Sequence, residues 1–269
     1  DAGWTFSHWS GALSGSDNPA NLIITEDTTV TAHFTQNQYT LSINMDGSGS
    51  VAKNPDQPTY AYGTVVELTA TADLGWTFAG WSGDLSGSQN PVEIMMDSSK
   101  SVTVTFTQNQ YTLSITTIGE GTVDKSPYQA TYTQGTVVTL TAAPNLGWSF
   151  SGWSGDLTGS TNPTAITMDS HKSVIATFTQ DQYTLVITIV GQGEVTKNPD
   201  QTTYTYGTPV QLTATPASGW SFSGWNGDLS GAENPATISM NGNKAVTATF
   251  TQDQYTLTIN IDGEGTVTK

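Results

Sequence analysis

The sequence predicts an all-β protein, built as a tandem array of small six-stranded β modules with a 72-residue period. Three observations predict this fold class. The chain repeats without insertion or deletion, short segments alternate apolar and polar residues, and turns rich in Gly and Ser separate these segments. A constant period that is long enough for a small domain indicates an array of like modules.

The repeat is clearest at its aromatic residues, which recur 72 residues apart: Trp4, Trp76, Trp148 and Trp220; Trp9, Trp81, Trp153 and Trp225; Phe34, Phe106, Phe178 and Phe250; Tyr39, Tyr111, Tyr183 and Tyr255. This register predicts a partial repeat over 1–35, complete repeats over 36–107, 108–179 and 180–251, and a second partial repeat over 252–269. Because the sequence starts and stops inside a repeat, we expect it to be a segment of a longer polypeptide.

The first complete repeat illustrates the expected strands. Apolar residues at every second position from Tyr39 to Met45 predict a half-buried strand. The turn over 46–49 contains two glycines and leads to a short return strand that ends at Asn54 and Pro55. Glycines in a tight turn between two strands predict a β-hairpin.

The remainder of the repeat predicts four more strands. Alternation over 66–71 indicates the third, and the aromatic segment 75–81 the fourth. Residues 82–91 are too rich in Gly and Ser for a strand, so we expect a long loop or one helical turn there. The fifth and sixth strands are expected around 94–96 and 102–106, and no segment has the period of an amphipathic helix.

The aromatic residues are the expected core, because a small β module must bury its few large side chains. Simple alternation places Trp76 and Phe78 on one face of their strand and Trp81 on the other. At most one of the two tryptophans is therefore expected to be fully buried. The other is expected to cover the loop or to pack on the neighbouring repeat.

The joints between repeats are short and polar. Residues 107–110 read Thr-Gln-Asn-Gln, without the Gly or Pro of a flexible tether. The apolar positions change from even numbers in 102–106 to odd numbers in 111–115, so the chain must bend or bulge at the joint while it stays extended. We expect a stiff string of modules.

Composition excludes several classes of partner. The chain has 7 Lys and no Arg against 23 acidic residues, which gives a net charge of -16. We therefore expect no nucleic-acid partner and no attraction to anionic membranes, because both depend on basic residues. No apolar run has membrane-spanning length, so no membrane insertion is expected in this segment. The absence of Cys removes disulfides and thiolate chemistry, and the polar composition is typical of an extracellular or cell-surface protein.

The repeats resemble the divergent internalin-type B-repeat family of bacterial and archaeal surface proteins. The segments that carry the resemblance are Gly80-Trp81-Ser82-Gly83, Asn90-Pro91, Met96 and Lys100-Ser101-Val102-Thr103-Val104-Thr105-Phe106, with their counterparts in the other repeats. The first copy departs from the pattern, with His8 in place of Gly80 and Thr28 in place of Lys100. The resemblance implies a compact β-grasp-like fold and a spacer or adhesive role, with no catalytic residue. The strand pattern itself fits a β-grasp or a small sandwich.

Two sets of residues invite a search for metal sites. His8, His33 and His171 occupy three different positions of the repeat, so no pair with ligand spacing is expected and all three are interpreted as solvent-facing substitutions. The loop carboxylates could ligate calcium, but each loop offers only one, so a bond to the loop's own backbone is the preferred interpretation. These residues are Asp84, Asp156 and Asp228, with Ala12 in the first copy.

Three other patterns have structural interpretations. The turns Gly47-Ser48-Gly49, Gly119-Glu120-Gly121, Gly191-Gln192-Gly193 and Gly263-Glu264-Gly265 join strands, whereas a phosphate loop precedes a helix. The Trp and Tyr residues could stack on sugars, but core packing is the preferred interpretation. Lys53, Lys125, Lys197 and Lys269 invite an isopeptide crosslink to a neighbouring Asn, yet Ser126 replaces that Asn in one copy, which favours exposed edge-strand lysines.

The sequence therefore predicts no enzyme, and no catalytic, cofactor or metal site. The leading hypothesis is a structural repeat region of an extracellular fibre, filament or cell-surface stalk that self-associates through its repeated surfaces. One alternative is an adhesive array that recognises carbohydrate or protein. Another is an accessory region of a large secreted enzyme.

Overall fold

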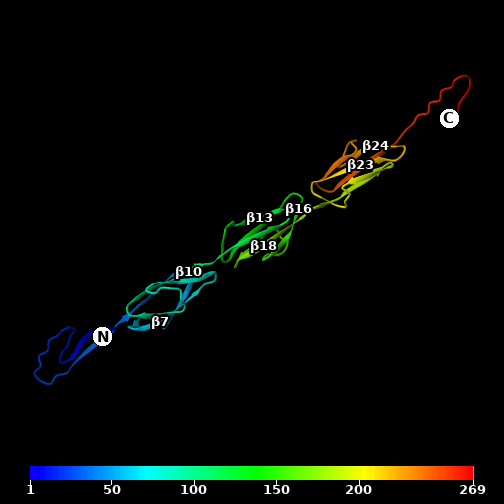
Figure 1. Cartoon of the computed structure of the whole chain (residues 1–269). Helices are drawn as coiled ribbons and strands as arrows, with labels where there is room; N and C mark the ends of the chain where they lie inside the picture. The colour runs from blue at the N-terminus through cyan, green and yellow to red at the C-terminus, as the bar shows by residue number, and fades with distance from the viewer. Residues whose placement is uncertain (269) are drawn as a thin grey trace. The chain divides into compact units, whose positions relative to one another are not determined.

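The computed structural model describes residues 1–268, and all their regular structure is β-strand (Figure 1). The chain forms two compact units, one made of residues 1–113, 129–137 and 167–171 and the other of the remainder. Counted from the tyrosines that open them, Tyr39 and Tyr183, the repeat 39–110 lies within the first unit and the repeat 183–254 within the second.

The first partial repeat has two strands, β1 (Trp4–Gly11) and β2 (Val30–Gln36). The next repeat has β3 (Gln38–Tyr39), β4 (Leu41–Asp46), β5 (Gly49–Asn54), β6 (Tyr60–Ala61), β7 (Thr64–Ala72), β8 (Trp76–Gly83), β9 (Val92–Met96) and β10 (Lys100–Gln108). The middle repeat has β11 (Gln110–Tyr111), β12 (Leu113–Ile118), β13 (Gly121–Ser126), β14 (Tyr132–Thr133), β15 (Thr136–Pro144), β16 (Trp148–Gly155), β17 (Thr164–Met168) and β18 (Lys172–Gln180). The last complete repeat has β19 (Gln182–Tyr183), β20 (Leu185–Val190), β21 (Gly193–Asn198), β22 (Tyr204–Thr205), β23 (Thr208–Pro216), β24 (Trp220–Gly227), β25 (Ala236–Met240) and β26 (Lys244–Gln252). Residues 253–268 contain no strand.

Each complete repeat is built from two three-stranded sheets. In the repeat 39–110, β10 lies between β4, its parallel neighbour, and β8, its antiparallel neighbour. The second sheet has the order β5-β7-β9 and is antiparallel throughout. The same arrangement recurs as β20-β26-β24 and β21-β23-β25. The six longer strands confirm the predicted all-β, six-stranded module, and the two sheets without a helix correspond to a small sandwich.

The predicted hairpin over residues 39–55 is wrong. Its two strands, β4 and β5, belong to different sheets, so the turn between them is an arch that joins the two sheets. Gly47 has a φ of 94°, and a Cβ added to it would collide with the carbonyl oxygen of Phe106. The alternation identified both strands correctly, but β4 takes β10 as its partner because this pairing buries Phe106 beneath the arch.

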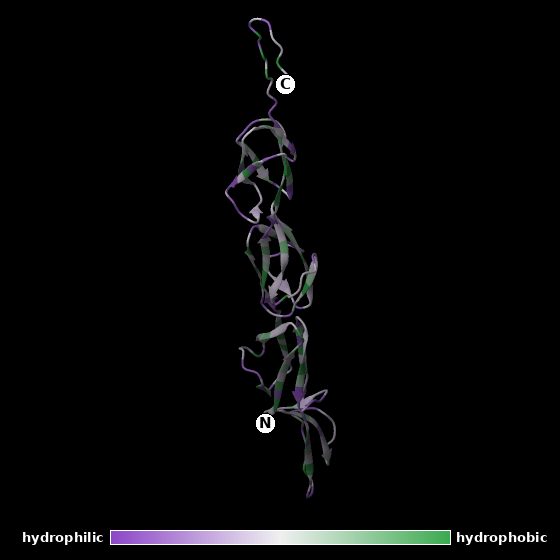
Figure 2. Ribbon diagram, turned by 90° about the vertical axis from the view of Figure 1, so that its right-hand side faces the viewer, coloured by the Kyte–Doolittle hydropathy of each residue, from purple (hydrophilic) through white to green (hydrophobic). Residues whose placement is uncertain are grey.

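The core lies between the two sheets. In the repeat 39–110 it contains Tyr60, Val66, Leu68, Ala70, Trp81, Ile94, Met96, Val102, Val104 and Phe106. In Figure 2 the strands carry their hydrophobic residues as bands separated by polar ones, as the period-two pattern predicts. Tyr60 is fully buried, and its hydroxyl donates to the carbonyl of Pro55 at 3.0 Å and accepts from the amide of Gln57 at 3.2 Å.

A β-bulge changes the predicted orientation of the tryptophans. In the β8–β10 register Phe78 faces Phe106 and Gly80 faces Thr105, so Ala79 is an extra residue. The bulge turns both Phe78 and Trp81 inward, with their ring centroids 5.4 Å apart. The expectation that one tryptophan at most is fully buried is confirmed by Trp81, at 5% exposure, but the assignment of Phe78 and Trp81 to opposite faces is wrong.

The other tryptophan, Trp76, is half-buried and covers the arch. A Cβ added to Gly47 would lie 2.9 Å from its Cζ3 atom. In each complete repeat the first tryptophan therefore packs on the arch and the second lies in the core. Trp148 and Trp220 occupy the first position, and Trp153 and Trp225 the second.

Candidate functional site

The loop that follows the tryptophans folds back onto Trp81. The amide of Trp81 donates to the carbonyl of Gly87 at 2.7 Å, and its indole Nε1 donates to the carbonyl of Gln89 at 3.0 Å. The corresponding indole bonds are formed by Trp9, Trp153 and Trp225. The segment is thus an ordered loop rather than a helical turn, and the buried tryptophan fixes its path.

The Asn of the Asn-Pro motif completes the edge of β7. The side chain of Asn90 accepts a hydrogen bond from the amide of Ala70 at 2.8 Å and donates one to the carbonyl of Ala70 at 2.7 Å. Asn162 and Asn234 make the same pair of bonds to Ala142 and Ala214. The motif therefore has a structural role. Its constant spacing in the sequence indicated such a role but did not identify Ala70 as the partner.

The loop carboxylates bind backbone, but their partners lie at the start of the last strand of each repeat and not in the carboxylates' own loop, so the preferred interpretation is wrong about the partner. One oxygen of Asp84 accepts from the amide of Ser101 at 2.7 Å, and the amide of Asp84 donates to the carbonyl of Ser101 at 3.0 Å. Asp156 and Asp228 repeat this arrangement with Ser173 and Ala245. Within residues 1–268 the structure brings together no group of three or more His, Cys, Asp or Glu side chains.

The histidines differ from the expectation in one respect. His171 is exposed, and its Nδ1 accepts from the amide of Thr112 at 3.1 Å. It thereby replaces the hydroxyl of Ser99, which accepts from the amide of Thr40 in the repeat before. His8 and His33, however, face each other across β1 and β2. The spacing of the histidines in the sequence did not reveal this facing pair, because the antiparallel register joins positions that are far apart in the sequence.

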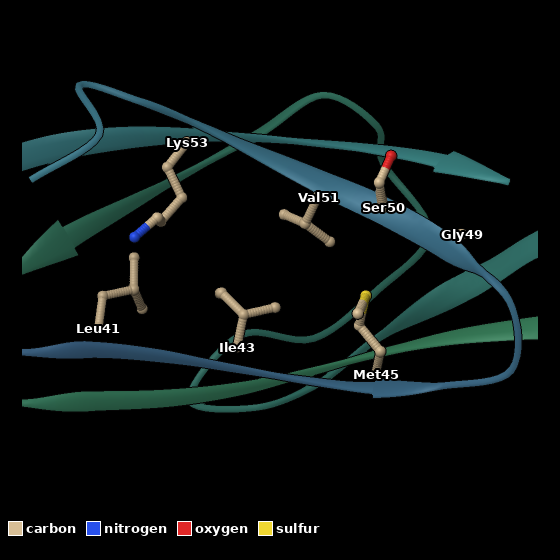
Figure 3. A pocket seen from close by; sticks show the side chains of 7 residues that line it. All are labelled: Leu41, Ile43, Met45, Gly49, Ser50, Val51 and Lys53. Carbon is tan, nitrogen blue, oxygen red and sulfur yellow. The ribbon is translucent and has the colours of Figure 1, made fainter.

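An apolar slot lies at the open edge between the two sheets of the repeat 39–110. Leu41, Ile43 and Met45 of β4 point toward Val51 and Lys53 of β5 across a hollow of about 420 Å³ (Figure 3). The slot exists because β4 and β5 diverge into separate sheets. Its residues recur in register, as Leu185, Ile187, Ile189, Val195 and Lys197 show.

The lysine at the end of the slot forms an ion pair. Lys53 Nζ lies 2.8 Å from a carboxylate oxygen of Asp56, and this hydrogen bond raises the pKa of Lys53 above its ordinary value. Lys197 pairs with Asp200 in the same way, whereas Lys125 lies over the ring of Tyr128. These contacts involve Asp and Tyr rather than the Asn of the isopeptide alternative, and Lys269 lies outside the described residues.

The joints repeat a second set of contacts. The amide of Asn109 donates to the carbonyl of Gly75 at 2.8 Å, and its side chain accepts from the hydroxyl of Thr77 at 2.7 Å. The next two residues form β11, which pairs with β14 of the following repeat. Gly75 is also so close to Gln134 of that repeat that an added Cβ would collide with its side chain. The joint therefore contains no free linker residue.

The two-sheet fold and the motif residues recur in the complete repeats, and the joint contacts recur at Asn37, Asn109 and Asp181. Consecutive segments of the chain match the profile of the divergent InlB B-repeat domain over residues 1–38, 39–110, 111–182 and 183–254. The chain belongs to the divergent InlB B-repeat family. This confirms the resemblance seen in the sequence.

Other comparisons are more distant. A solved structure described as the Bacillus anthracis TIE protein is 9% identical to these B-repeats, with a TM-score of 0.44 over 84% of this chain. The chain spans 55% of the length of that structure. No curated protein matches it. Within the described residues, no helix of these B-repeats has the length and apolar character of a membrane span.

The motif residues of the B-repeats are accounted for by structure. Trp81 and Asn90 tie the loop to the two sheets, Asp84 binds the start of β10, and Met96 is fully buried. Three features remain available for function. They are the open slot, the joints and the residues that differ from one B-repeat to another.

Proposed function

We propose that this chain is a non-catalytic structural repeat region of an extracellular fibre, filament or cell-surface stalk. Membership of the B-repeat family and the acidic, Cys-free composition support a surface location. The observation that carries the structural role is the joint, where residues of the linker bind the preceding repeat and enter a strand of the next one.

The joint supports a mechanical function because it restricts rotation between neighbouring repeats. At the joint after residue 180, the amide of Asp181 donates to the carbonyl of Gly147 at 2.8 Å, and the hydroxyl of Ser149 donates to its carboxylate at 2.6 Å. At the joint after residue 36, Asn37 makes the equivalent bonds to Gly3 and Thr5. Modules joined in this way keep a fixed orientation from one repeat to the next. A binding module on a flexible tether does not require such a fixed orientation.

The absence of Cys from the sequence allows a direct test with site-specific labels. Spin labels attached to Ser98→Cys and Ser170→Cys occupy equivalent exposed positions in neighbouring repeats. We expect a narrow distance distribution in the native chain and a broad one after a Gly-Ser-Gly-Ser insertion behind Asn109. Equally broad distributions in both chains would contradict the structural role.

The apolar slot favours a second candidate, an adhesive array. Its walls of Leu41, Ile43 and Met45 fit apolar side chains of a protein better than the hydroxyls of a sugar. Repetition of a weak site along the chain would raise avidity. Ile43→Lys should abolish capture of a protein partner without altering the joint, and unchanged capture would remove this candidate.

A further inference from the structure

The first partial repeat carries a histidine pair at facing positions. His8 of β1 lies opposite His33 of β2, with the ring centroids 4.4 Å apart and the ring planes 6° from parallel. The facing residues at this place in the other repeats are Gly80 and Thr105, Gly152 and Thr177, and Gly224 and Thr249. The first partial repeat is therefore the one copy in which both residues of this facing pair are histidine.

Each ring is also held by a neighbouring hydroxyl. His33 Nε2 lies 2.7 Å from Ser10 Oγ, and His8 Nδ1 lies 3.1 Å from Ser7 Oγ. When these nitrogens carry the proton and donate to the hydroxyls, the free lone pairs are on His8 Nε2 and His33 Nδ1. A second hydrogen bond of this kind is what fixes the tautomer and orientation of a metal-bound histidine.

We propose that His8 and His33 form a binding site for a divalent transition metal ion of the Ni²⁺, Cu²⁺ and Zn²⁺ class. Imidazole suits these ions, whereas Ca²⁺ and Mg²⁺ prefer oxygen ligands. In a tetrahedral Zn²⁺ site, metal–nitrogen bonds of roughly 2.0–2.1 Å place the two ligand nitrogens about 3.3 Å apart. The ring centroids are 4.4 Å apart and the rings are nearly parallel, so the exposed His8 ring must rotate for both nitrogens to reach one ion.

The remaining ligands of the ion are water, because within residues 1–268 no third His or acidic side chain joins the pair. The site therefore binds by chelation across two strands, so the ion also stabilises the pairing of β1 with β2. The net charge of -16 attracts cations to the whole chain, but only a paired site distinguishes transition ions from Ca²⁺.

Calorimetric titration of the whole chain with Ni²⁺, without a polyhistidine tag, tests the proposal. We expect one bound equivalent, with no comparable heat from Ca²⁺ or Mg²⁺. His8→Gly and His33→Thr place the residues of the other repeats at this pair and should each weaken binding at least tenfold. His171→Ser, which restores the hydroxyl found at Ser99, is the matched control and should bind Ni²⁺ like the native chain.

A second measurement does not depend on the variants. Cu²⁺ bound to the native chain should show the electron paramagnetic resonance signature of two nitrogen ligands, and it should selectively broaden the imidazole NMR signals of His8 and His33. Equal losses of affinity in all three variants, or broadening of His171 to the same extent, would overturn the proposal in favour of independent single-histidine binding.

Discussion

The two tryptophans of each repeat have different environments, although the sequence presents them as a pair. Trp81 is buried and anchors the loop through its indole, whereas Trp76 is half-buried over the arch. Alternation predicted that they differ in burial but could not identify the bulge at Ala79, because a single extra residue leaves no periodic signal.

Replacement of these residues should have unequal effects. Trp81→Ala removes a core side chain and should cost about 3–5 kcal/mol of unfolding free energy, and Trp76→Ala should cost clearly less. Denaturant unfolding followed by circular dichroism measures both. Because the energetics of arrays are mostly local, the other repeats should keep their stability. A larger loss for Trp76→Ala would contradict the assignment of Trp81 to the core.

Asn90 provides a second test at the scale of single residues. Its side chain forms hydrogen bonds with both the amide and the carbonyl of Ala70. Without this side chain, the two backbone groups would lose these partners. Asn90→Ala should cost about 1–3 kcal/mol, the usual penalty for an unsatisfied polar group. Hydrogen exchange at the amide of Ala70 should accelerate. Gln89→Ala is the control, because Gln89 contributes its backbone carbonyl, and a similar loss there would contradict the role of Asn90.

At the scale of elements, the sequence predicted strands better than strand partners. Period-two alternation is a local property, so the segments over β4, β5, β7, β8, β9 and β10 could be found directly. Pairing depends on contacts far apart in the sequence, such as the parallel alignment of Lys100 with Leu41. For the same reason the facing histidines, the slot and the bond between Asp84 and Ser101 of β10 could not be predicted.

The arch between the sheets can be tested with two glycines of similar backbone conformation. Gly47 and Gly63 have φ values of 94° and 82°, so alanine is strained at both. A Cβ at Gly47 would in addition collide with Phe106, whereas the space around Gly63 is open. Gly47→Ala should therefore destabilise the repeat more than Gly63→Ala in thermal unfolding. Equal losses would show that φ strain alone sets the effect.

At the scale of the whole molecule, the constant period and the short polar joints of the sequence predict an elongated array. Compact-domain scaling gives each 72-residue repeat a radius of gyration of about 11 Å, and extended joints would make the chain about 110 Å long. Small-angle scattering of the chain should give the profile of an elongated particle, and a compact globule would contradict it.

Self-association is the prediction that separates a filament from a single-chain stalk. Each complete repeat presents the open strand edges that β4 and β5 form in the repeat 39–110, so a contact that fits one complete repeat fits the next. Repetition of a contact that does not close gives filaments. The net charge of -16 opposes indiscriminate contact between chains. Association should therefore strengthen as salt or divalent ions screen the acidic residues. Sedimentation velocity of the chain at high concentration, over a titration of NaCl and then of CaCl₂, measures this. A chain that stays monomeric throughout would contradict the filament and leave the stalk, because the joints act within one chain and need no second copy.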